Sequence, residues 1–227
     1  SAFITERKET GRIYLMNVDH ANEHGAFKPD IAPIRMSNLC CEIDLPTKPL
    51  NSYDDEKGEI SLCTLSAINW GLINEPADFE KYCTLAVRAL DELLDYQSYP
   101  IEAAKKGTLS RRPLGVGIIN LAYFLAKRGL KYDESAYKIV DEYAEAWSYY
   151  LIKASADLAA EKGRMIYNTS SKYSDGILPI DTYKEAIDTL IKPRERFPWK
   201  VLRQQLRETG IRNSTFCLLY TSPSPRD

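Results

Sequence analysis

Three side chains with complementary chemistry occupy alternate positions of one short stretch: Asn38, Cys40 and Glu42. If this stretch is extended, its side chains point alternately to two faces, so the amide, the thiol and the carboxylate share one face. The other face then carries a row suited to packing: Leu39, Cys41 and Ile43. A thiol between a hydrogen-bonding amide and a carboxylate base is typical of an active site. The alternative is that Cys40 is buried, because free cysteine usually behaves as a small hydrophobic residue.

Cys63 is a second candidate for this chemistry, because the connector at residues 49–58 is rich in turn-forming residues and can bring its thiol back to Cys40. A metal site is the competing interpretation. Neither the Cys-x-x-Cys motif nor the histidine pairs of zinc sites occur in the sequence. His20 and His24 are four residues apart, but they lie in a loop-like composition without the HExxH pattern, so no metal site is predicted.

The pattern of apolar residues predicts the elements that position these side chains. Residues 34–45 lie between two prolines, which favours an extended or loop-tip segment. Residues 59–70 are rich in apolar and β-branched side chains and predict a buried strand with Cys63 near its centre. Residues 1–33 are predicted to be irregular, with two recognisable parts: a short strand at 11–14 and a polar loop at 20–29.

The rest of the chain is predicted to be mostly helical, since apolar residues recur at helical spacing in four segments: residues 74–94, part of 114–128, 133–161 and 199–207. Gly129 and Gly210 are expected to end two of them. The apolar stripe of the first segment consists of Leu85, Ala86, Ala89, Leu90, Leu93 and Leu94, and that of the third of Ala136, Val140, Tyr143, Trp147, Tyr150, Leu151, Ala154 and Leu158. Residues 211–219 predict a further strand. This order of elements favours an α/β fold with parallel strand pairing, in which Cys83 and Cys217 are packing residues.

The pair Gly115 and Gly117 follows two arginines, Arg111 and Arg112. One interpretation is a phosphate cradle at the start of a helix. The sequence lacks the third glycine of a dinucleotide-binding fingerprint and the Lys-Ser/Thr of a P-loop. The interpretation that we favour is a glycine pair that allows close helix packing.

Composition excludes several function classes. The chain has 227 residues, of which 44% are hydrophobic, and a net charge of −2, which gives no electrostatic case for nucleic acid binding. No apolar run approaches the roughly 20 residues needed to span a membrane. Five cysteines without regular spacing favour reduced thiols in the cytoplasm over a secreted disulfide framework.

Seven stretches resemble the large, catalytic subunit of class I ribonucleotide reductases: TGRIYLMNVDHANEH, IAPIRMSNLCCEIDLPTKPL, GEISLCTLSAINWG, RALDELLDYQSYP, RRPLGVGIINLAYFLAKRG, GILPIDTYK and IRNST. They span residues 10–215, and the Asn-Leu-Cys-x-Glu row followed by Leu-Cys-Thr-Leu-Ser is highly specific. The resemblance implies that residues 1–219 are part of a ten-stranded α/β barrel, with 34–45 as its finger loop and 59–70 as a barrel strand. Residues 220–227 do not resemble the family and are predicted to be a foreign tail.

The resemblance also implies an activity, the reduction of ribonucleoside diphosphates to 2′-deoxyribonucleoside diphosphates by thiyl-radical chemistry. Cys40 looks like the cysteine that carries the thiyl radical and abstracts the 3′-hydrogen. Glu42 looks like the general base on the 3′-hydroxyl, and Asn38 resembles the amide that orients the substrate. Cys63 is similar to one of two redox-active thiols that end as a disulfide, and its family partner lies outside this segment. Cys41 departs from the family pattern, which has an aliphatic residue there.

By the same resemblance, the intact protein is expected to form a homodimer and to receive its radical from a metal-containing small subunit. Thioredoxin or glutaredoxin would re-reduce it, and ATP and deoxynucleoside triphosphates would act as effectors. No cofactor or metal is expected to be bound by this segment itself. The segment is expected to be inactive alone. Two alternatives stand: a non-catalytic nucleotide-binding paralogue and a fragment of a decayed gene.

Overall fold

The computed structural model of the chain describes residues 2–39, 41–192 and 195–216. At its centre β1 (Thr64–Asn69) and β2 (Leu114–Ile119) form a parallel two-stranded sheet, with the two strands paired along their whole length. Parallel strands need a long crossover connection, which here contains two helices. The predicted α/β architecture with parallel pairing is therefore confirmed.

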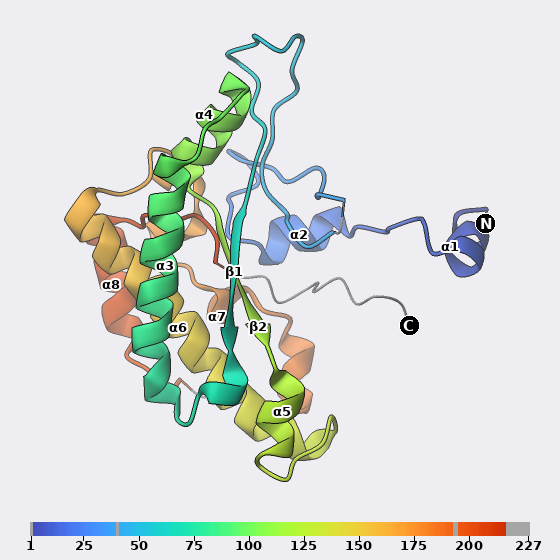
Figure 1. The fold of residues 1–227 in the computed structure, drawn as a ribbon, viewed down its shortest axis with the longest axis vertical. Coiled ribbons are helices and arrows are strands. Elements are labelled where there is room, and N and C mark those ends of the chain that lie inside the picture. The colour runs from blue at the N-terminus through green and yellow to red at the C-terminus, as the bar shows by residue number, and fades with distance from the viewer. Residues whose placement is uncertain (1, 40, 193–194, 217–227) are drawn as a thin grey trace.

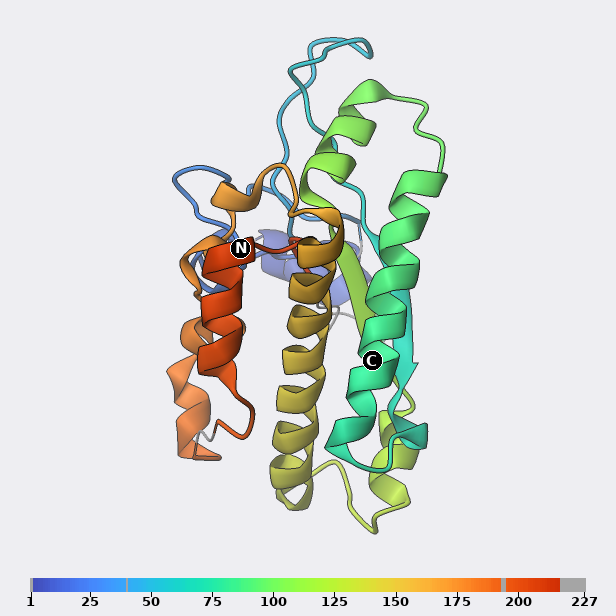
Figure 2. The ribbon, with the colours of Figure 1, turned by 90° about the vertical axis from the view of Figure 1, so that its left-hand side faces the viewer.

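Three long helices form a layer on one side of the sheet (Figures 1 and 2). α3 (Phe79–Tyr96) packs on the sheet, α6 (Tyr137–Lys162) packs along α3, and α8 (Trp199–Thr209) packs against α6. The main hydrophobic core is formed by side chains of these helices and of both strands. The other helices are short: α1 (Ala2–Thr10), α2 (Val18–His24), α4 (Glu102–Arg111), α5 (Leu121–Ala126) and α7 (Pro179–Thr182). Single 3-10 turns complete the fold: η1 (Trp70–Leu72), η2 (Pro76–Asp78), η3 (Glu134–Ala136), η4 (Asn168–Ser170), η5 (Lys172–Asp175) and η6 (Glu185–Thr189).

The buried strand predicted at 59–70 is shorter than expected. β1 begins at Thr64, so Cys63 lies just before the strand and not near its centre. Glu59 instead forms an isolated antiparallel bridge with Lys48, which takes the start of the segment away from the sheet. β1 is also only half buried, whereas a continuous apolar run is typical of a strand covered on both faces.

The segment 114–128 contains a strand followed by a helix: α5 confirms the helix predicted in part of this segment, whereas the strand β2 was not predicted. The main-chain N–H groups of β2 donate on its second edge to the carbonyl groups of Thr215 and Phe216, so β2 is paired on both sides. The glycine pair of this segment therefore lies in a strand, and the helix that packs on this strand is α3. A short apolar run is typical both of a buried strand and of a buried helix, so periodicity could not distinguish them. α5 then follows, and Gly129 with φ +68° lies just beyond its end, as predicted.

The predicted stripe of α6 is confirmed, because all of its residues are buried or half-buried. The stripe predicted for α3 is partly wrong, since Leu85 and Leu93 are 64% and 47% exposed. The apolar residues that α3 buries are Phe79, Cys83, Val87, Leu90 and Leu94. Both sides of α3 carry apolar residues, so the spacing alone did not identify the core face. The helix predicted at 199–207 is confirmed by α8. It ends just before Gly210, whose φ is +79°, as predicted.

The N-terminal region is more helical than predicted. α2 occupies part of the polar loop predicted at 20–29, and residues 11–14 form no strand. α1 buries none of its residues. Beside α2 lies a second, small hydrophobic cluster: Phe27, Ala32, Ile34 and Leu45. Among the described residues, no helix combines the length and the apolar character needed to cross a membrane.

Residues 211–216 run beside β2 but are not assigned as a regular strand. A buried ionic network fixes them to the helical layer. Asp91 of α3 accepts hydrogen bonds from Arg112 at 2.6 Å, from Arg212 at 3.1 Å and from the amide of Asn213 at 2.9 Å. The remainder of the strand predicted at 211–219 lies outside the described residues, as do Cys217 and residues 220–227.

Candidate active site

The loop at residues 34–45 closes on itself through Asn38. Its side-chain oxygen accepts the main-chain N–H groups of Glu42 at 3.1 Å and Ile43 at 3.0 Å, and its amide nitrogen donates to the Glu42 carboxylate. The main-chain N–H of Cys41 donates to the Asn38 carbonyl at 3.1 Å. The loop therefore brings the amide and the carboxylate together, as predicted, but through a turn and not through an extended strand. Cys40 lies outside the described residues.

The turn also changes the residues predicted to pack. Leu39 is 84% exposed, so the apolar row predicted for the opposite face is wrong at this position. Cys41 has φ +60°, a left-handed conformation that is uncommon for a residue other than glycine. Its sulfur lies 3.1 Å from the hydroxyl oxygen of Ser37. Ile43 packs, as predicted, against the small hydrophobic cluster.

The carboxylate of Glu42 is bound on one side only. Its Oε1 accepts the Asn38 amide, whereas its buried Oε2 has no hydrogen-bond partner among the described residues. A buried polar atom without a partner is costly, and such atoms occur where a substrate or water completes the site. One oxygen of Glu42 therefore has a hydrogen-bonding capacity that the described residues leave unused.

Cys63 lies beside this loop. Its half-buried side chain packs against the same cluster as Ile43, and burial raises the pKa of its thiol to about 12, with the nearby charge of Glu42 adding to the rise. The structure thus brings Asn38, Glu42 and Cys63 to one place. A thiol with this pKa is protonated at neutral pH, so Cys63 can give up a hydrogen but is a poor nucleophile.

A buried ion pair joins the two chain segments that lead into the site. The Glu59 carboxylate accepts Lys48 Nζ and Arg111 Nη1, each at 2.5 Å, and Arg111 also stacks on the ring of Tyr167. Burial favours a raised pKa for Glu59, but the hydrogen bonds from the two cations outweigh it and hold the pKa below its usual value. We call these four side chains the stem cluster. It holds the end of the loop segment at Lys48 beside the start of the segment that leads to Cys63.

The stem cluster also excludes the phosphate cradle considered for the arginine pair. Arg111 is bound to Glu59, and Arg112 donates to Asp91 and Asp95. Both guanidinium groups are more than nine-tenths buried, so neither is presented to a ligand.

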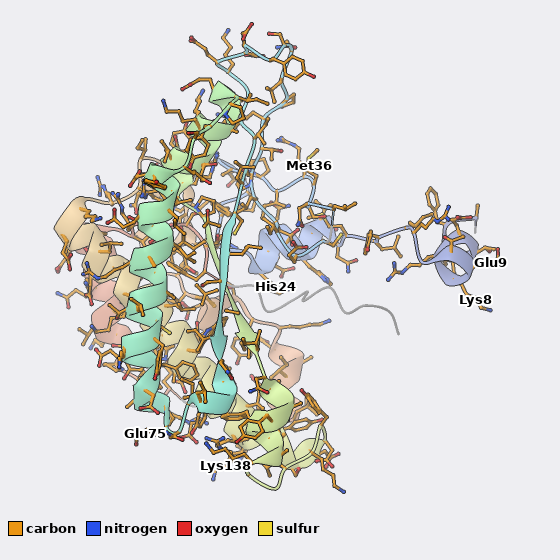
Figure 3. All side chains as sticks on the ribbon, viewed as in Figure 1. Lys8, Glu9, His24, Met36, Glu75 and Lys138 are labelled. Atoms are coloured by element: carbon orange, nitrogen blue, oxygen red, sulfur yellow. The ribbon has the colours of Figure 1, made fainter. Side chains whose placement is uncertain are left out.

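No metal centre is formed by the described residues, since no group of three metal-binding side chains occurs among them. His24, at the end of α2 nearest the sheet (Figure 3), lies 2.5 Å through Nδ1 from the carbonyl oxygen of Thr182. Cys83 is completely buried in α3, and burial raises the pKa of its thiol, which agrees with its predicted packing role.

Two polar residues around the loop were not identified from the sequence. Asp44 has a buried Oδ1 without a hydrogen-bond partner among the described residues, and burial raises its pKa. Its position two residues after Glu42, on the same alternating row, was the available signal. Asn22 of α2 binds the main chain of Ile34, at the start of the loop. Nothing in the local sequence of Asn22 indicates this contact, because its partner is distant in the chain.

Comparison with known proteins identifies a family over nearly the whole chain. Residues 1–223 match the family model described as ribonucleotide reductase, barrel domain. The chain is 53% identical over 223 residues to the ribonucleoside-diphosphate reductase 1 subunit alpha of Escherichia coli (strain K12), with 98% of this chain and 29% of that protein covered. It is 52% identical over 218 residues to the subunit alpha of Buchnera aphidicola subsp. Schizaphis graminum, with 96% and 29% covered. The subunit alpha of Enterobacteria phage T4 is 45% identical over 224 residues, with 95% and 28% covered. The chain spans less than a third of the length of these relatives.

Proposed function

We propose, because this chain belongs to the ribonucleotide reductase family, that it forms part of a catalytic barrel that reduces ribonucleoside diphosphates to 2′-deoxyribonucleoside diphosphates. The observation that carries the proposal is the contact of Asn38 with Glu42 next to Cys63, in which one carboxylate oxygen has no partner among the residues that the structure describes. An amide that binds, a carboxylate that accepts a proton and a thiol that supplies hydrogen are the groups that this reduction requires.

In the proposed mechanism, the Cys40 thiyl radical takes the hydrogen atom from C3′ of the ribose. Glu42 accepts the proton of the 3′-hydroxyl through its free oxygen, which favours loss of the 2′-hydroxyl as water. Cys63 and a second thiol outside this segment supply two hydrogens and two electrons and end as a disulfide. Return of the hydrogen atom to C3′ restores the Cys40 radical, and Glu42 returns its proton to the 3′-oxygen. Asn38 orients both Glu42 and the substrate.

The complete protein is proposed to act with partners that this chain does not contain. A metal-containing small subunit would generate the radical, and a second large subunit would complete a homodimer. Thioredoxin or glutaredoxin would reduce the disulfide after each turnover, and ATP and deoxynucleoside triphosphates would regulate activity. We propose that it works in the cytoplasm, where reduced thiols persist.

The test uses a complete alpha chain that carries this segment, assayed with its small subunit. Glu42→Gln keeps the size of the side chain but removes the base, so turnover should fall by about 10²–10⁴-fold while substrate binding changes little. Cys40→Ser should abolish turnover, because a serine hydroxyl cannot carry the radical under the same conditions. Cys63→Ser should prevent repeated turnover.

Two variants control for non-specific damage. Glu56→Gln removes an exposed carboxylate on the connector between the loop and Cys63, and Cys83→Ser removes a thiol of the main core. Turnover per folded molecule should remain near that of the unmodified protein in both. Undiminished turnover in Glu42→Gln or Cys40→Ser would overturn the proposed mechanism and favour a non-catalytic paralogue.

A further inference from the structure

We propose that Asn22 is a positioning residue of this site: it holds the start of the loop at 34–45 so that Asn38 and Glu42 meet Cys63. The inference rests on the proposed function. It goes beyond that function by assigning a role to a residue of α2 that has no contact with the reacting groups.

The side chain of Asn22 is fully engaged, mostly by one residue of the loop. Its Oδ1 accepts the main-chain N–H of Ile34 at 2.8 Å, and its Nδ2 donates to the Ile34 carbonyl at 2.8 Å. Nδ2 also donates to the Val18 carbonyl within α2, at 2.9 Å. The amide thus pairs with both polar groups of one residue, as a neighbouring strand would. Since the Ile34 N–H requires an acceptor, the pairing also fixes the orientation of the amide.

α2 is a firm support for this contact because a distant segment holds it from the other side. Lys172 Nζ donates to the carbonyls of Asn22 at 3.1 Å and Glu23 at 2.6 Å, at the last turn of the helix. Thr182 donates its hydroxyl to the His24 carbonyl at 3.1 Å. A helix of seven residues is not stable by itself, so these contacts maintain it.

Packing connects Ile34 with the site. Ile34 is 2% exposed and lies in the small hydrophobic cluster with Leu45, at the other end of the loop. Ile43 and Cys63 pack against this cluster, and the N–H of Ile43 donates to the Asn38 side chain. Close-packed side chains transmit small shifts, so movement of Ile34 changes how the loop meets Cys63.

The test compares Asn22→Asp with Asn22→Ala in the complete alpha chain with its small subunit. An ionised carboxylate cannot donate to the Ile34 carbonyl, so kcat of Asn22→Asp at pH 8 should fall about 10–100-fold with KM within about threefold. A protonated carboxyl group restores one donor and one acceptor. The activity of Asn22→Asp relative to the unmodified protein should therefore rise as the pH is lowered towards the ordinary aspartate pKa of about 3.9. The activity of Asn22→Ala relative to the unmodified protein should be low and should not change with pH.

The charged and titratable groups around this position are Asp19, His20, Glu23 and His24 on α2 and Lys172 on the facing segment. All of them are also present in Asn22→Ala, which therefore controls for them. Asn74→Asp controls for the added charge, because Asn74 is exposed and its side chain accepts a hydrogen bond from Lys127. Its activity should equal that of the unmodified protein at each pH tested. Hydrogen exchange of residues 34–45 should become faster in both Asn22 variants.

Unchanged kcat in both Asn22 variants, or a loss in Asn22→Asp that does not depend on pH, would overturn the positioning role. These outcomes differ from failure of the proposed function, which is tested by Glu42→Gln with Asn22 intact. If Glu42→Gln retains turnover, the proposed function fails, while faster exchange of residues 34–45 still identifies Asn22 as the residue that holds the loop.

Discussion

Cys63 combines a position beside Glu42 with a thiol that resists ionisation. Burial, assisted by the charge of Glu42, raises its pKa to about 12. The thiol form is therefore the one present during the proposed reaction, in which Cys63 supplies a hydrogen and not an attacking thiolate. The same surroundings protect the thiol from unwanted alkylation and oxidation, which require the thiolate.

We expect iodoacetamide to modify Cys63 very slowly in the folded protein. At pH 8 a thiol with a pKa of about 12 has a thiolate fraction on the order of 10⁻⁴, and this fraction rises about tenfold per pH unit below the pKa. Mass spectrometry of peptides after timed alkylation at pH 7 to 9.5 measures the rate, with the urea-unfolded chain as control. Alkylation of folded Cys63 at the rate of the unfolded chain at pH 8 would contradict the burial described here.

The predicted meeting of Asn38 and Glu42 is correct, but the geometry behind it is not. Alternation along an extended segment placed them on one face, whereas a turn closed by Asn38 brings them into contact. A side-chain amide that bonds its own loop is a common turn device, and residue spacing does not distinguish it from a strand. The exposure of Leu39 follows from the same turn. Asn22 could not be predicted, because its partner Ile34 belongs to another element.

At the scale of elements, the stem cluster and α2 hold the two ends of the site loop. Lys48 and Glu59 are bridged through both their main chains and their side chains, and Ser61 donates its hydroxyl to the Pro46 carbonyl at 2.5 Å. Gly107 of α4 lies against this stem, where an added Cβ would lie 2.4 Å from the Ile60 carbonyl oxygen. The main chain at Ile60 therefore packs directly on α4, with no space for a side chain at Gly107.

Glu59→Gln should weaken the stem cluster and so increase the local opening of residues 46–62. The variant keeps one acceptor oxygen but loses the negative charge and places an NH2 group against one of the two cations, which removes a hydrogen bond to a charged group worth about 1.5–3 kcal/mol in local stability. Hydrogen exchange in residues 46–62, measured in a complete alpha chain at pH 7, should accelerate, while Glu56→Gln, on the exposed connector, should leave it unchanged. Because the folded pKa of Glu59 is lowered, its stabilisation is present above the usual value of 4.5 and is lost as the pH falls through the folded pKa.

The hydrogen-exchange rates of residues 46–62 in Glu59→Gln and in the unmodified protein should therefore differ most at neutral pH. This difference in rate should become smaller only below about pH 4.5. Equal exchange of residues 46–62 at pH 7 in the two proteins would show that the ion pair does not hold the stem.

Elements with a strong period were predictable, and elements fixed by distant pairing were not. α6 and α8 carry apolar stripes that define both their type and their buried face. β2 is a strand because β1 and residues 215–216 hydrogen-bond to its two edges, which a local apolar run does not reveal. α2 has a polar sequence and depends on Lys172 for support, so its composition suggested a loop.

For the whole molecule, the decisive feature is the unpaired edge of β1. Within the described residues β1 pairs only with β2, and Leu62 and Leu65 are 40% and 50% exposed beside the open edge. Unpaired edges with apolar side chains favour association between chains. The relatives are more than three times as long as this chain, so they have further segments that can cover the corresponding edge.

We expect the isolated chain of 227 residues to be poorly soluble for this reason. Size-exclusion chromatography should show large aggregates, and Leu65→Lys should reduce them, since an edge lysine opposes strand pairing. Val201→Lys changes a residue of α8 that is 66% exposed and far from the edge, so it should give less improvement. A monodisperse isolated chain with a cooperative melting transition would contradict the expectation.

The bridge between Lys48 and Glu59 has a consequence for how the chain can vary in length. The connector at 49–58 begins and ends at this bridge, so the positions of its two ends are fixed whatever its length. Doubling the length of such a loop costs only about 0.6 kcal/mol of closure entropy. A flexible insertion after Asp54 should therefore leave turnover of a complete alpha chain unchanged, as a reductase assay can verify. This makes the connector a suitable place for an epitope or a fluorescent label.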